Sequence, residues 1–410
     1  MFKTPKSLRL QIGLFGRTNV GKSTFLNYIA NQNVSITSSV PGTTTDVVEK
    51  AMELLPIGPV LFLDTAGIDD KSEIASLRLE KTGNVFERSD VFVLIIEPGV
   101  WGDYEEKIFK ESLKQKTPVI IVVNKVDIKR PDDEFINKIE KYSKHILVIS
   151  CNDKSNQDYV MHEFKRRVIS VMPSDFLTPL PIIGDLIPRG GIAILIVPID
   201  KEAPKGRIIL PQVQTIRDAL DNDQMTITVK ESEYKNALGK LKKNPDLVVC
   251  DSQVVDKMVA ATPKGVKCTT FSILFARIKG DLVGMVKAAS AMHKLVDGDR
   301  ILISESCSHH PIEDDIGRVK IPRWLKEYIG KDILFDSCAG RDFPDDLKKY
   351  KLIIQCGGCM ITRREVLARI EKAKAQNIPI TNYGVSISLM QGVLKNVLSP
   401  FPEAMDVLDN

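Results

Sequence analysis

The sequence has no long hydrophobic run, no leader-like block near its start and no large excess of charge, and each absence excludes a class of protein. Its longest apolar stretches, VFVLII at 91–96 and IAILIV at 192–197, are far shorter than the roughly 18 residues that a membrane-spanning helix needs. The basic residues near the start are followed by neither an apolar block nor a small-residue cleavage site, so we expect a cytoplasmic protein with no membrane partner. The net charge is only +4, and lysine and arginine form no long run interleaved with aromatic residues. A dedicated nucleic-acid-binding protein is therefore not expected.

The remaining composition is that of a folded protein with several domains. The chain has 410 residues, of which 43% are hydrophobic and 27% are charged, as in ordinary globular proteins. At roughly 150 residues per domain, it should hold two or three domains. Cysteine occurs seven times and histidine only five times, yet His309 and His310 lie close to Cys307. In an intracellular chain these cysteines indicate thiol chemistry or metal ligation rather than a disulfide framework.

Short apolar runs alternate with helix-like segments along most of the chain, which indicates the α/β class with parallel sheets. Strands are expected at 10–15, 60–64, 91–96, 118–124, 145–150, 192–199, 226–230, 246–250, 300–306, 332–337, 351–356 and 379–384, and a helix at 362–376. Proline and glycine are concentrated at 172–190, which predicts a linker there. We therefore predict three α/β domains, at 1–172, 185–265 and 266–410. The middle domain carries no chemical motif, so we expect it to be structural or oligomeric.

A phosphate-binding loop is predicted at residues 16–23, where GRTNVGKS matches GxxxxGKS between an expected strand and an expected helix. In such a loop the main-chain N–H groups and the helix N-terminus cradle the phosphates. Lys22 would bridge the β and γ phosphates, and the Ser23 hydroxyl would ligate magnesium. Gly16, Gly21 and Thr24 belong to the same nucleotide-binding segment.

Three further motifs follow in the order found in GTPases: PGTTTD at 41–46, DTAG at 64–67 and NKVD at 124–127. In the first, Thr44 is the candidate for a second hydroxyl on magnesium. In the second, Asp64 would hold magnesium through water, and the Gly67 N–H would meet the γ-phosphate. We therefore predict that Lys22, Thr44 and Gly67 act in catalysis and that Ser23, Thr44 and Asp64 hold Mg²⁺.

The NKVD motif predicts that the nucleotide is GTP. It contributes Asn124, Lys125 and Asp127. The carboxylate of Asp127 would accept hydrogen bonds from N1 and N2 of guanine, and adenine would leave this acceptor unpaired. The SCN segment at 150–152 follows the next expected strand, so Ser150 and Cys151 would complete the base pocket.

On these motifs, the first domain resembles the Era and MnmE group of small GTPases. In that group the residue after DTAG is apolar instead of the glutamine that orients water, and this chain has Ile68. Asn19 matches the asparagine that helps to hold a potassium ion near the phosphates. The resemblance implies slow intrinsic GTP hydrolysis in which K⁺ supplies charge that an arginine finger supplies elsewhere.

A second cluster of chemistry lies near the C-terminus, where CSHH begins at 307 and CGGC occupies 356–359. The second motif falls between an expected strand and helix, and the N-terminus of a helix favours thiolates. Three thiolates, from Cys307, Cys356 and Cys359, with one replaceable ligand suit an iron–sulfur cluster. Three thiolates with a histidine also suit structural zinc, and a CxxC pair alone also suits redox chemistry. The third cysteine, preceded by a carboxylate and followed by two histidines, favours a metal over a redox pair. The spacing does not separate an iron–sulfur cluster from zinc.

The fourth ligand has two candidates. If the strand expected at 300–306 continues to residue 309, alternation places Glu305, Cys307 and His309 on one side, so Glu305 or His309 could complete the set. Cys338 is a weaker candidate ligand. The remaining cysteines, Cys151, Cys250 and Cys268, lie in or beside apolar strands and are expected to be buried small hydrophobic residues.

The combination of an Era-like GTPase, a motif-free middle region and a C-terminal CxH…CxxC set resembles the HydF family, the scaffold GTPases of iron–iron hydrogenase maturation. The resemblance covers essentially the whole chain, although the family pattern is CxH…HCxxC and Gln355 stands where the second histidine would be. It implies a homodimer formed through the middle domain and a 4Fe–4S cluster on Cys307, Cys356 and Cys359 with an exchangeable fourth position. It also implies that the chain receives a two-iron precursor from radical-SAM maturases and delivers it to apo iron–iron hydrogenase.

Two other interpretations remain open at this point. One is a ribosome- or tRNA-related GTPase whose cysteines bind structural zinc, which would need a basic RNA-binding module after the GTPase domain. The other is a redox protein that uses Cys356 and Cys359 as a dithiol pair under the control of GTP.

Overall fold

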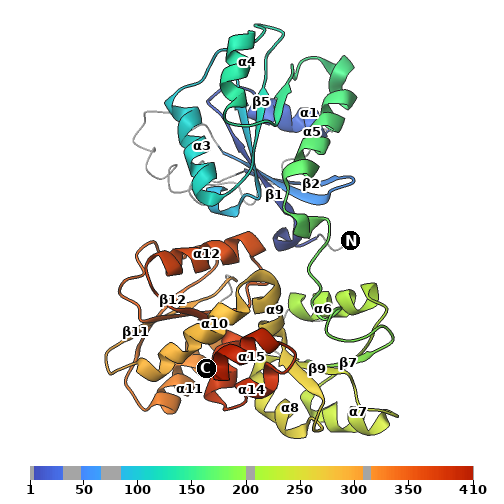
Figure 1. Cartoon of the computed structure of the whole chain (residues 1–410), viewed down its shortest axis with the longest axis vertical. Helices are drawn as coiled ribbons and strands as arrows, with labels where there is room; N and C mark the ends of the chain where they lie inside the picture. Colours follow the sequence, from blue (N-terminus) through green and yellow to red (C-terminus); the bar gives the residue numbers. More distant parts are fainter. Residues whose placement is uncertain (1–3, 31–47, 66–84, 200–207, 308–314, 410) are drawn as a thin grey trace. The chain divides into compact units, whose positions relative to one another are not determined.

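The chain folds into two compact units, Met1–Pro179 and Leu180–Asn410 (Figure 1). The computed structural model describes residues 4–30, 48–65, 85–199, 208–307 and 315–409. The division between the units falls within the segment rich in proline and glycine at 172–190. Across these described ranges, every helix is too short or too polar to cross a bilayer.

The first unit is built on a six-stranded sheet with the order β2-β3-β1-β4-β5-β6. Its strands are β1 (Leu10–Phe15), β2 (Val48–Leu54), β3 (Gly58–Asp64), β4 (Val91–Ile96), β5 (Val119–Val123) and β6 (Ile146–Val148). All neighbouring strands are parallel except β2, which pairs antiparallel with β3 at the edge of the sheet. The predicted parallel sheet is therefore confirmed, with one edge strand that the apolar runs did not predict.

Helices cover both faces of this sheet (Figure 1). On one face lie α1 (Lys22–Ala30) and α5 (Gln157–Val171), and on the other lie α3 (Asp103–Gln115) and α4 (Asp133–Glu140). Every residue of β1 is buried, because a parallel strand in the middle of such a sheet is covered on both sides. The rings of Phe25 and Phe164 meet edge to face, with centroids 5.4 Å apart, and join α1 to α5.

The second unit contains two parallel four-stranded sheets, with the orders β10-β9-β7-β8 and β12-β11-β13-β14. The first sheet consists of β7 (Ile192–Ile196), β8 (Met225–Val229), β9 (Leu247–Cys250) and β10 (Lys267–Thr270). The second consists of β11 (Arg300–Ser304), β12 (Leu334–Cys338), β13 (Leu352–Gln355) and β14 (Ile380–Asn382). The first sheet thus takes in residues 267–270, which lie beyond the predicted boundary at 265. The α/β class predicted for the whole chain is confirmed.

The two sheets of the second unit share one hydrophobic core. Its helices are α6 (Leu210–Asp221), α7 (Tyr234–Lys240), α8 (Val255–Ala261), α9 (Phe271–Lys279), α10 (Leu282–Ala289), α11 (Ile321–Ile329), α12 (Arg363–Ala375), α13 (Tyr383–Met390), α14 (Leu394–Val397) and α15 (Pro402–Asp409). Helix α9 begins directly after β10, and its residues Ile273, Leu274 and Phe275 are fully buried in this core. Because it leads from the first sheet to the second, α9 places residues of the middle region against the C-terminal region.

Candidate functional site

The GxxxxGKS motif forms a tight loop between the end of β1 and the start of α1. Gly16 has φ +153°, and a Cβ at this position would lie 2.5 Å from the carbonyl oxygen of Ile95, so only glycine fits. The Lys22 ammonium donates hydrogen bonds to the carbonyl oxygens of Gly16 (2.7 Å) and Arg17 (2.9 Å), across the mouth of the loop. Asn19 has a left-handed backbone, with φ +65°. The loop thus has the shape and the positive charge that a phosphate chain requires.

An ion pair that the sequence analysis missed fastens this loop to α3. Arg17 donates to both carboxylate oxygens of Glu105, at 2.8 Å to Oε1 and 2.7 Å to Oε2. Glu105 is only 1% exposed. The Gly16 N–H also donates to the hydroxyl of Tyr104, at 3.1 Å. No motif links residues so far apart in the sequence, so only the fold could reveal the contact.

The predicted magnesium ligands Ser23 and Asp64 meet in the structure. The Ser23 hydroxyl donates to Asp64 Oδ2 at 3.2 Å, and Asp64 Oδ1 is buried without a hydrogen-bond partner among the described residues. Burial raises the pKa of Asp64, and the positive charge of Lys22 opposes this shift. A hydroxyl beside an unsatisfied carboxylate oxygen fits Mg²⁺, which prefers oxygen ligands. Thr44 and Gly67 lie outside the described residues.

We expect Lys22→Ala to lower GTP hydrolysis by about 10²- to 10³-fold, because it removes a charged donor aimed at the phosphates. Steady-state hydrolysis and the binding of a fluorescent GTP analogue would measure the loss. Lys138→Ala, which removes an exposed lysine from α4, is the matched control and should behave like the unmodified protein. Equal activity in the Lys22 and Lys138 variants would reject the phosphate site.

The predicted base-reading residues also lie together, at the carboxyl ends of β5 and β6. Asp127 accepts hydrogen bonds from the Ser150 hydroxyl at 2.6 Å and from the Asn152 amide at 3.1 Å. These bonds lower the pKa of Asp127, so its exposed carboxylate remains ionised. Lys125 forms an ion pair with Glu97 at 2.5 Å. The carboxylate is therefore oriented and could accept two hydrogen bonds from one base edge.

Asn124 connects this base-reading segment to the phosphate loop. Its amide nitrogen donates to the carbonyl of Val20 at 2.9 Å, and its amide oxygen accepts from the Cys151 N–H at 3.2 Å. Asn124 is 2% exposed, so both bonds are shielded from water. Burial raises the pKa of the Cys151 thiol to about 12, so this cysteine stays neutral, as expected for a buried small side chain.

The second site lies at the carboxyl edge of the C-terminal sheet. Cys307 follows β11, while Cys356 and Cys359 follow β13, the strand that pairs with β11. Because neighbouring parallel strands end at the same edge, these cysteines gather there. Cys356 Sγ lies 3.1 Å from the main-chain nitrogen and 3.2 Å from the hydroxyl of Ser306. Both groups of Ser306 could donate to a thiolate at this position.

The three cysteines influence one another electrostatically. Burial, followed by the negative charges of Cys356, Cys359 and Glu305, raises the pKa of Cys307 to about 12. Burial and Cys356 raise the pKa of Cys359 to about 11. Within the described ranges, no three side chains of His, Cys, Asp or Glu converge closely enough to form a ready single-ion site. A bound cationic centre would oppose both the burial, which is the larger cause, and the mutual repulsion that raise the pKa values of these thiols.

The alternation argument for the fourth ligand is wrong, because β11 ends at Ser304 and does not continue toward residue 309. Glu305 is 4% exposed, its Oε2 pairs with Arg318 Nε at 3.2 Å, and its Oε1 accepts from the Tyr383 hydroxyl at 3.5 Å. A Cβ on Gly317 would lie only 2.1 Å from that hydroxyl, so the packing around the carboxylate depends on glycine. Glu305 is therefore held beside the cysteines by other side chains. His309 lies outside the described residues.

Lys279 is a further residue of this site, and no sequence pattern marked it. Its ammonium donates to the carbonyl oxygens of Gly358 at 2.9 Å and Ile361 at 2.8 Å, so it holds the CGGC loop. The side chain is only 6% exposed. Burial lowers the pKa of Lys279 to about 8, and the negative charges of Cys359, Glu365 and Cys356 act in the opposite direction. A lysine at the end of an apolar helix would normally be expected at the surface.

The other cysteines are separate from this cluster or at its margin. Cys250 and Cys268 are 0% and 4% exposed, as expected, and burial raises the pKa of Cys268 to about 11. Cys338 ends β12 and is partly buried. Its carbonyl oxygen accepts from the Glu305 N–H at 2.9 Å, so it is a neighbour of the cysteine site.

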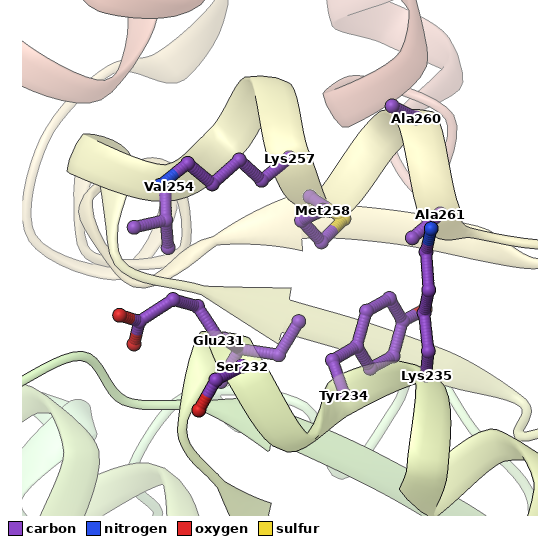
Figure 2. A pocket seen from close by; sticks show the side chains of 10 residues that line it. Glu231, Ser232, Tyr234, Lys235, Val254, Lys257, Met258, Ala260 and Ala261 are labelled. Atoms are coloured by element: carbon purple, nitrogen blue, oxygen red, sulfur yellow. The ribbon is translucent and has the colours of Figure 1, made fainter.

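A pocket of about 270 Å³ lies at the carboxyl edge of the middle sheet (Figure 2). It is lined by Ile196, Glu231, Ser232, Tyr234, Lys235, Val254, Lys257, Met258, Ala260 and Ala261. Strand β7, the first of this sheet in the sequence, lies between β8 and β9. The segments that follow β7 and β9 therefore lead away to opposite sides at this edge. Open α/β sheets commonly bind ligands at such a point. The sequence analysis expected only a structural role here, because the lining residues form no motif.

Three family models match successive parts of the chain. A model of the 50S ribosome-binding GTPases matches residues 11–125. The Hydrogen maturase F dimerization domain matches residues 182–280, and the Hydrogen maturase F tetramerization domain matches residues 283–400.

Individual relatives match part of the chain. GTPase Era of Thermoanaerobacter sp. (strain X514) is 30% identical over 250 residues, which cover 56% of this chain and 79% of the relative. The tRNA modification GTPase MnmE of Prochlorococcus marinus (strain NATL2A) is 33% identical over 154 residues, which cover 36% of this chain and 32% of that protein. Among solved structures, an Era protein of Aquifex aeolicus bound to GDP.AlF4⁻ aligns with 21% identity and a TM-score of 0.33, over 54% of this chain and 93% of that one.

The match to the GTPase model covers the phosphate loop and reaches Asn124 and Lys125 of the base-reading segment. The chain is thus a GTP-hydrolysing enzyme that uses GTP and Mg²⁺. The two Hydrogen maturase F models cover most of the second unit and indicate that the protein forms oligomers. The chain belongs to the HydF family of hydrogenase maturation GTPases.

Proposed function

We propose that this hydrogenase maturation GTPase carries a 4Fe–4S cluster on Cys307, Cys356 and Cys359. We further propose that it is the scaffold on which a two-iron precursor is assembled or from which it is delivered to apo iron–iron hydrogenase. The observation that carries the proposal is the gathering of these three cysteines, from the ends of two neighbouring strands, within electrostatic reach of one another.

The donor set is suited to a cluster in several respects. A four-iron cluster binds each thiolate through a different iron atom, so the thiolates need not converge on one point. The N–H and hydroxyl of Ser306 are placed to donate to the sulfur of Cys356, which is how proteins tune such clusters. Glu305 or His309 would serve as a weak fourth ligand. When bound, the cluster would supply an iron with a replaceable ligand, to which the precursor could attach.

The three parts of the chain would divide this work. Residues 1–172 bind and hydrolyse GTP, with Lys22, Ser23 and Asp64 at the phosphates and magnesium. Residues 185–265 hold the homodimer together, and residues 266–410 carry the cluster. Radical-SAM maturases would supply the precursor to the cluster-bearing part.

We expect GTP hydrolysis to be faster in K⁺ than in Na⁺, and Asn19→Ala to remove most of the difference. The left-handed backbone of Asn19 places this residue on the curved part of the phosphate loop, where a carboxamide oxygen could bind a monovalent cation. Rates measured in matched potassium and sodium buffers would test this. Equal rates of the unmodified protein in the two salts would reject a role for K⁺.

The experiment that tests the proposed function is anaerobic reconstitution of the full chain with iron and sulfide, followed by metal analysis and electron paramagnetic resonance (EPR) of the reduced protein. We expect iron and sulfide in equal amounts and the signal of a reduced cubane. Stoichiometric zinc that persists through the reconstitution would instead support the structural-zinc interpretation. Activation of apo-hydrogenase by protein preloaded with the two-iron precursor would then test delivery.

A further inference from the structure

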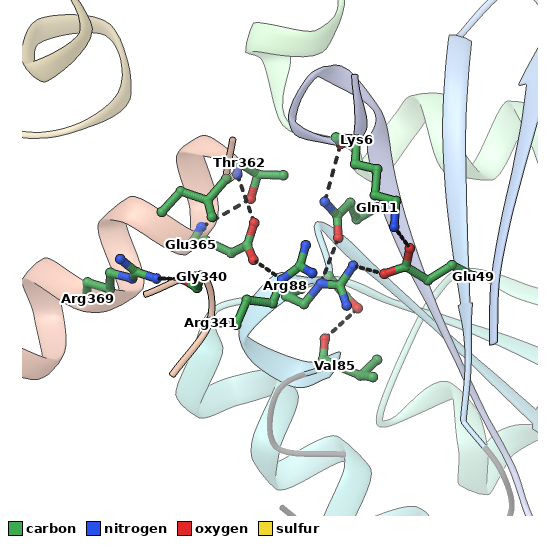
Figure 3. Close-up of polar contacts among 12 residues, drawn as sticks. Lys6, Gln11, Glu49, Val85, Arg88, Gly340, Arg341, Thr362, Glu365 and Arg369 are labelled. Atoms are coloured by element: carbon green, nitrogen blue, oxygen red, sulfur yellow. Dashed lines mark hydrogen bonds and ion pairs between the residues drawn. The ribbon is translucent and has the colours of Figure 1, made fainter. Parts of the chain in front are cut away.

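The buried ammonium of Lys279 has hydrogen-bond acceptors but no carboxylate partner. Its acceptors are the carbonyl oxygens of Gly358 and Ile361, and across the described ranges no carboxylate lies within ion-pair distance of Nζ. Glu365 is the acidic residue that acts on it electrostatically. The carboxylate of Glu365, however, accepts from Arg341 Nε at 2.9 Å and from the Thr362 N–H at 2.8 Å (Figure 3).

A buried charge without a counter-charge is unfavourable, because the loss of hydration is not balanced by an opposite charge nearby. The two carbonyl oxygens, and the face of the Phe275 ring whose centroid lies 5.7 Å from Nζ, offer only partial negative charge. The other negative groups that act on Lys279 are the sulfurs of Cys359 and Cys356. The positive charge is therefore balanced only when these sulfurs belong to an anionic centre.

We propose that Lys279 provides the counter-charge of the cysteine-bound cluster and thereby raises its reduction potential. This inference rests on the proposed function. Three thiolates outweigh the positive charge of an oxidised 4Fe–4S core, and reduction adds a further negative charge. A fixed ammonium beside two of the thiolates stabilises the reduced form more than the oxidised form, and the net charge around a cluster is one of the factors that set its potential. Lys279 is a positioning residue, because it acts on the cluster through the CGGC loop and its charge.

The contact between Lys279 and the CGGC loop also joins two parts of the chain that match different family models. Lys279 is the last residue of α9 and lies within the match to the dimerization domain, whereas the CGGC loop lies within the match to the tetramerization domain. The neighbouring carbonyl, that of Ile278, accepts from Arg363 Nε at 3.0 Å at the start of α12. The end of α9 thus contacts both the CGGC loop and the start of α12. The part of the chain that matches the dimerization domain therefore supplies a charge to a site built by the part that matches the tetramerization domain.

The test compares full-length protein, reconstituted with iron and sulfide, in three variants. Lys279→Met removes both the charge and the donors, Lys279→Gln removes the charge and keeps an N–H donor, and Lys279→Arg keeps the charge. Lys287→Met, which removes an exposed lysine from α10, is the matched control. Iron content and the midpoint potential, from a reductive titration followed by EPR, are the measurements.

We expect the equilibrium constant for reduction to fall at least about tenfold in the Met and Gln variants, which corresponds to about 59 mV for a one-electron couple. The Arg variant and the control should stay close to the unmodified protein. Loss of iron in the Met and Gln variants but not in the Arg variant would also support the counter-charge.

Three results would overturn the inference. The first is a full iron content with an unchanged potential in the Met and Gln variants. The second is a lowered potential in the Met variant alone, which would mean that the hydrogen bonds matter and the charge does not. The third is loss of iron in all three variants, which would assign Lys279 to the folding of the loop. An unmodified protein without iron after reconstitution would instead reject the proposed function, and with it this inference.

Discussion

We expect Cys307→Ala, Cys356→Ala and Cys359→Ala each to lose nearly all bound iron after anaerobic reconstitution. Two thiolates rarely retain a cubane, and each of these sulfurs would bind a different iron atom. The pairing of β11 with β13 fixes the two strand ends that supply them. Iron and sulfide analysis, together with the absorption spectrum, would measure the loss.

Cys338→Ala is the matched control for these variants. Cys338 also ends a strand of the same sheet, is also partly buried, and contributes its carbonyl to the Glu305 N–H. Its replacement should leave the iron content unchanged, whereas Glu305→Gln should keep the iron and change the EPR spectrum of the reduced cluster. GTP hydrolysis should survive all five substitutions, because the described parts of the nucleotide site lie in the first unit. Full iron in the three cysteine variants would contradict the ligand assignment.

Sequence motifs predicted which described residues of the candidate nucleotide site lie together, because in a parallel sheet the motif residues follow strand ends and meet at one edge. Ser23 meets Asp64, and Asp127 meets Ser150, as this rule requires. The same rule brings Cys307 to the strand end that precedes Cys356. It did not predict the strand at Val48–Leu54, because that edge strand is only partly buried and mixes charged with apolar residues instead of forming an apolar run.

The residues that support the sites could not be predicted from the sequence. The pairs Arg17–Glu105 and Glu305–Arg318 each join a residue in or beside a motif to a residue that belongs to none, and their spacing follows from the course of the chain between them. Lys279 could not be foreseen either, because a lysine that ends a helix is normally solvated. The alternation argument at Glu305 failed for a related reason. Side chains alternate only while the strand continues, and the sequence does not mark Ser304 as the end of β11.

The second large effect is expected on base preference, from a change at the Asp127 carboxylate. We expect Asp127→Asn to reverse the base preference from guanine to xanthine and to change the ratio of the two affinities by about 10⁴-fold or more. A site built to pair with a base edge discriminates by about that factor when the groups that the bound base covers are left unpaired. The carboxylate of Asp127 offers two acceptors to the donors of guanine, whereas asparagine offers one acceptor and one donor. The new donor would face a donor of guanine, which is unfavourable, but would face an acceptor of xanthine.

The contacts of Asp127 make this substitution mild for the fold and severe for recognition. Ser150 and Asn152 orient the carboxylate by donating one hydrogen bond to each oxygen, and an asparagine at 127 can keep the bond from Ser150 through its own oxygen. Asp132→Asn, at the N-cap of α4, is the matched control, since asparagine caps a helix about as well as aspartate and the same charge is removed. Binding of GTP and XTP to the three proteins, measured by calorimetry, would separate the outcomes. An Asp127 variant that binds GTP and XTP as the control does would show that this carboxylate does not contact the base.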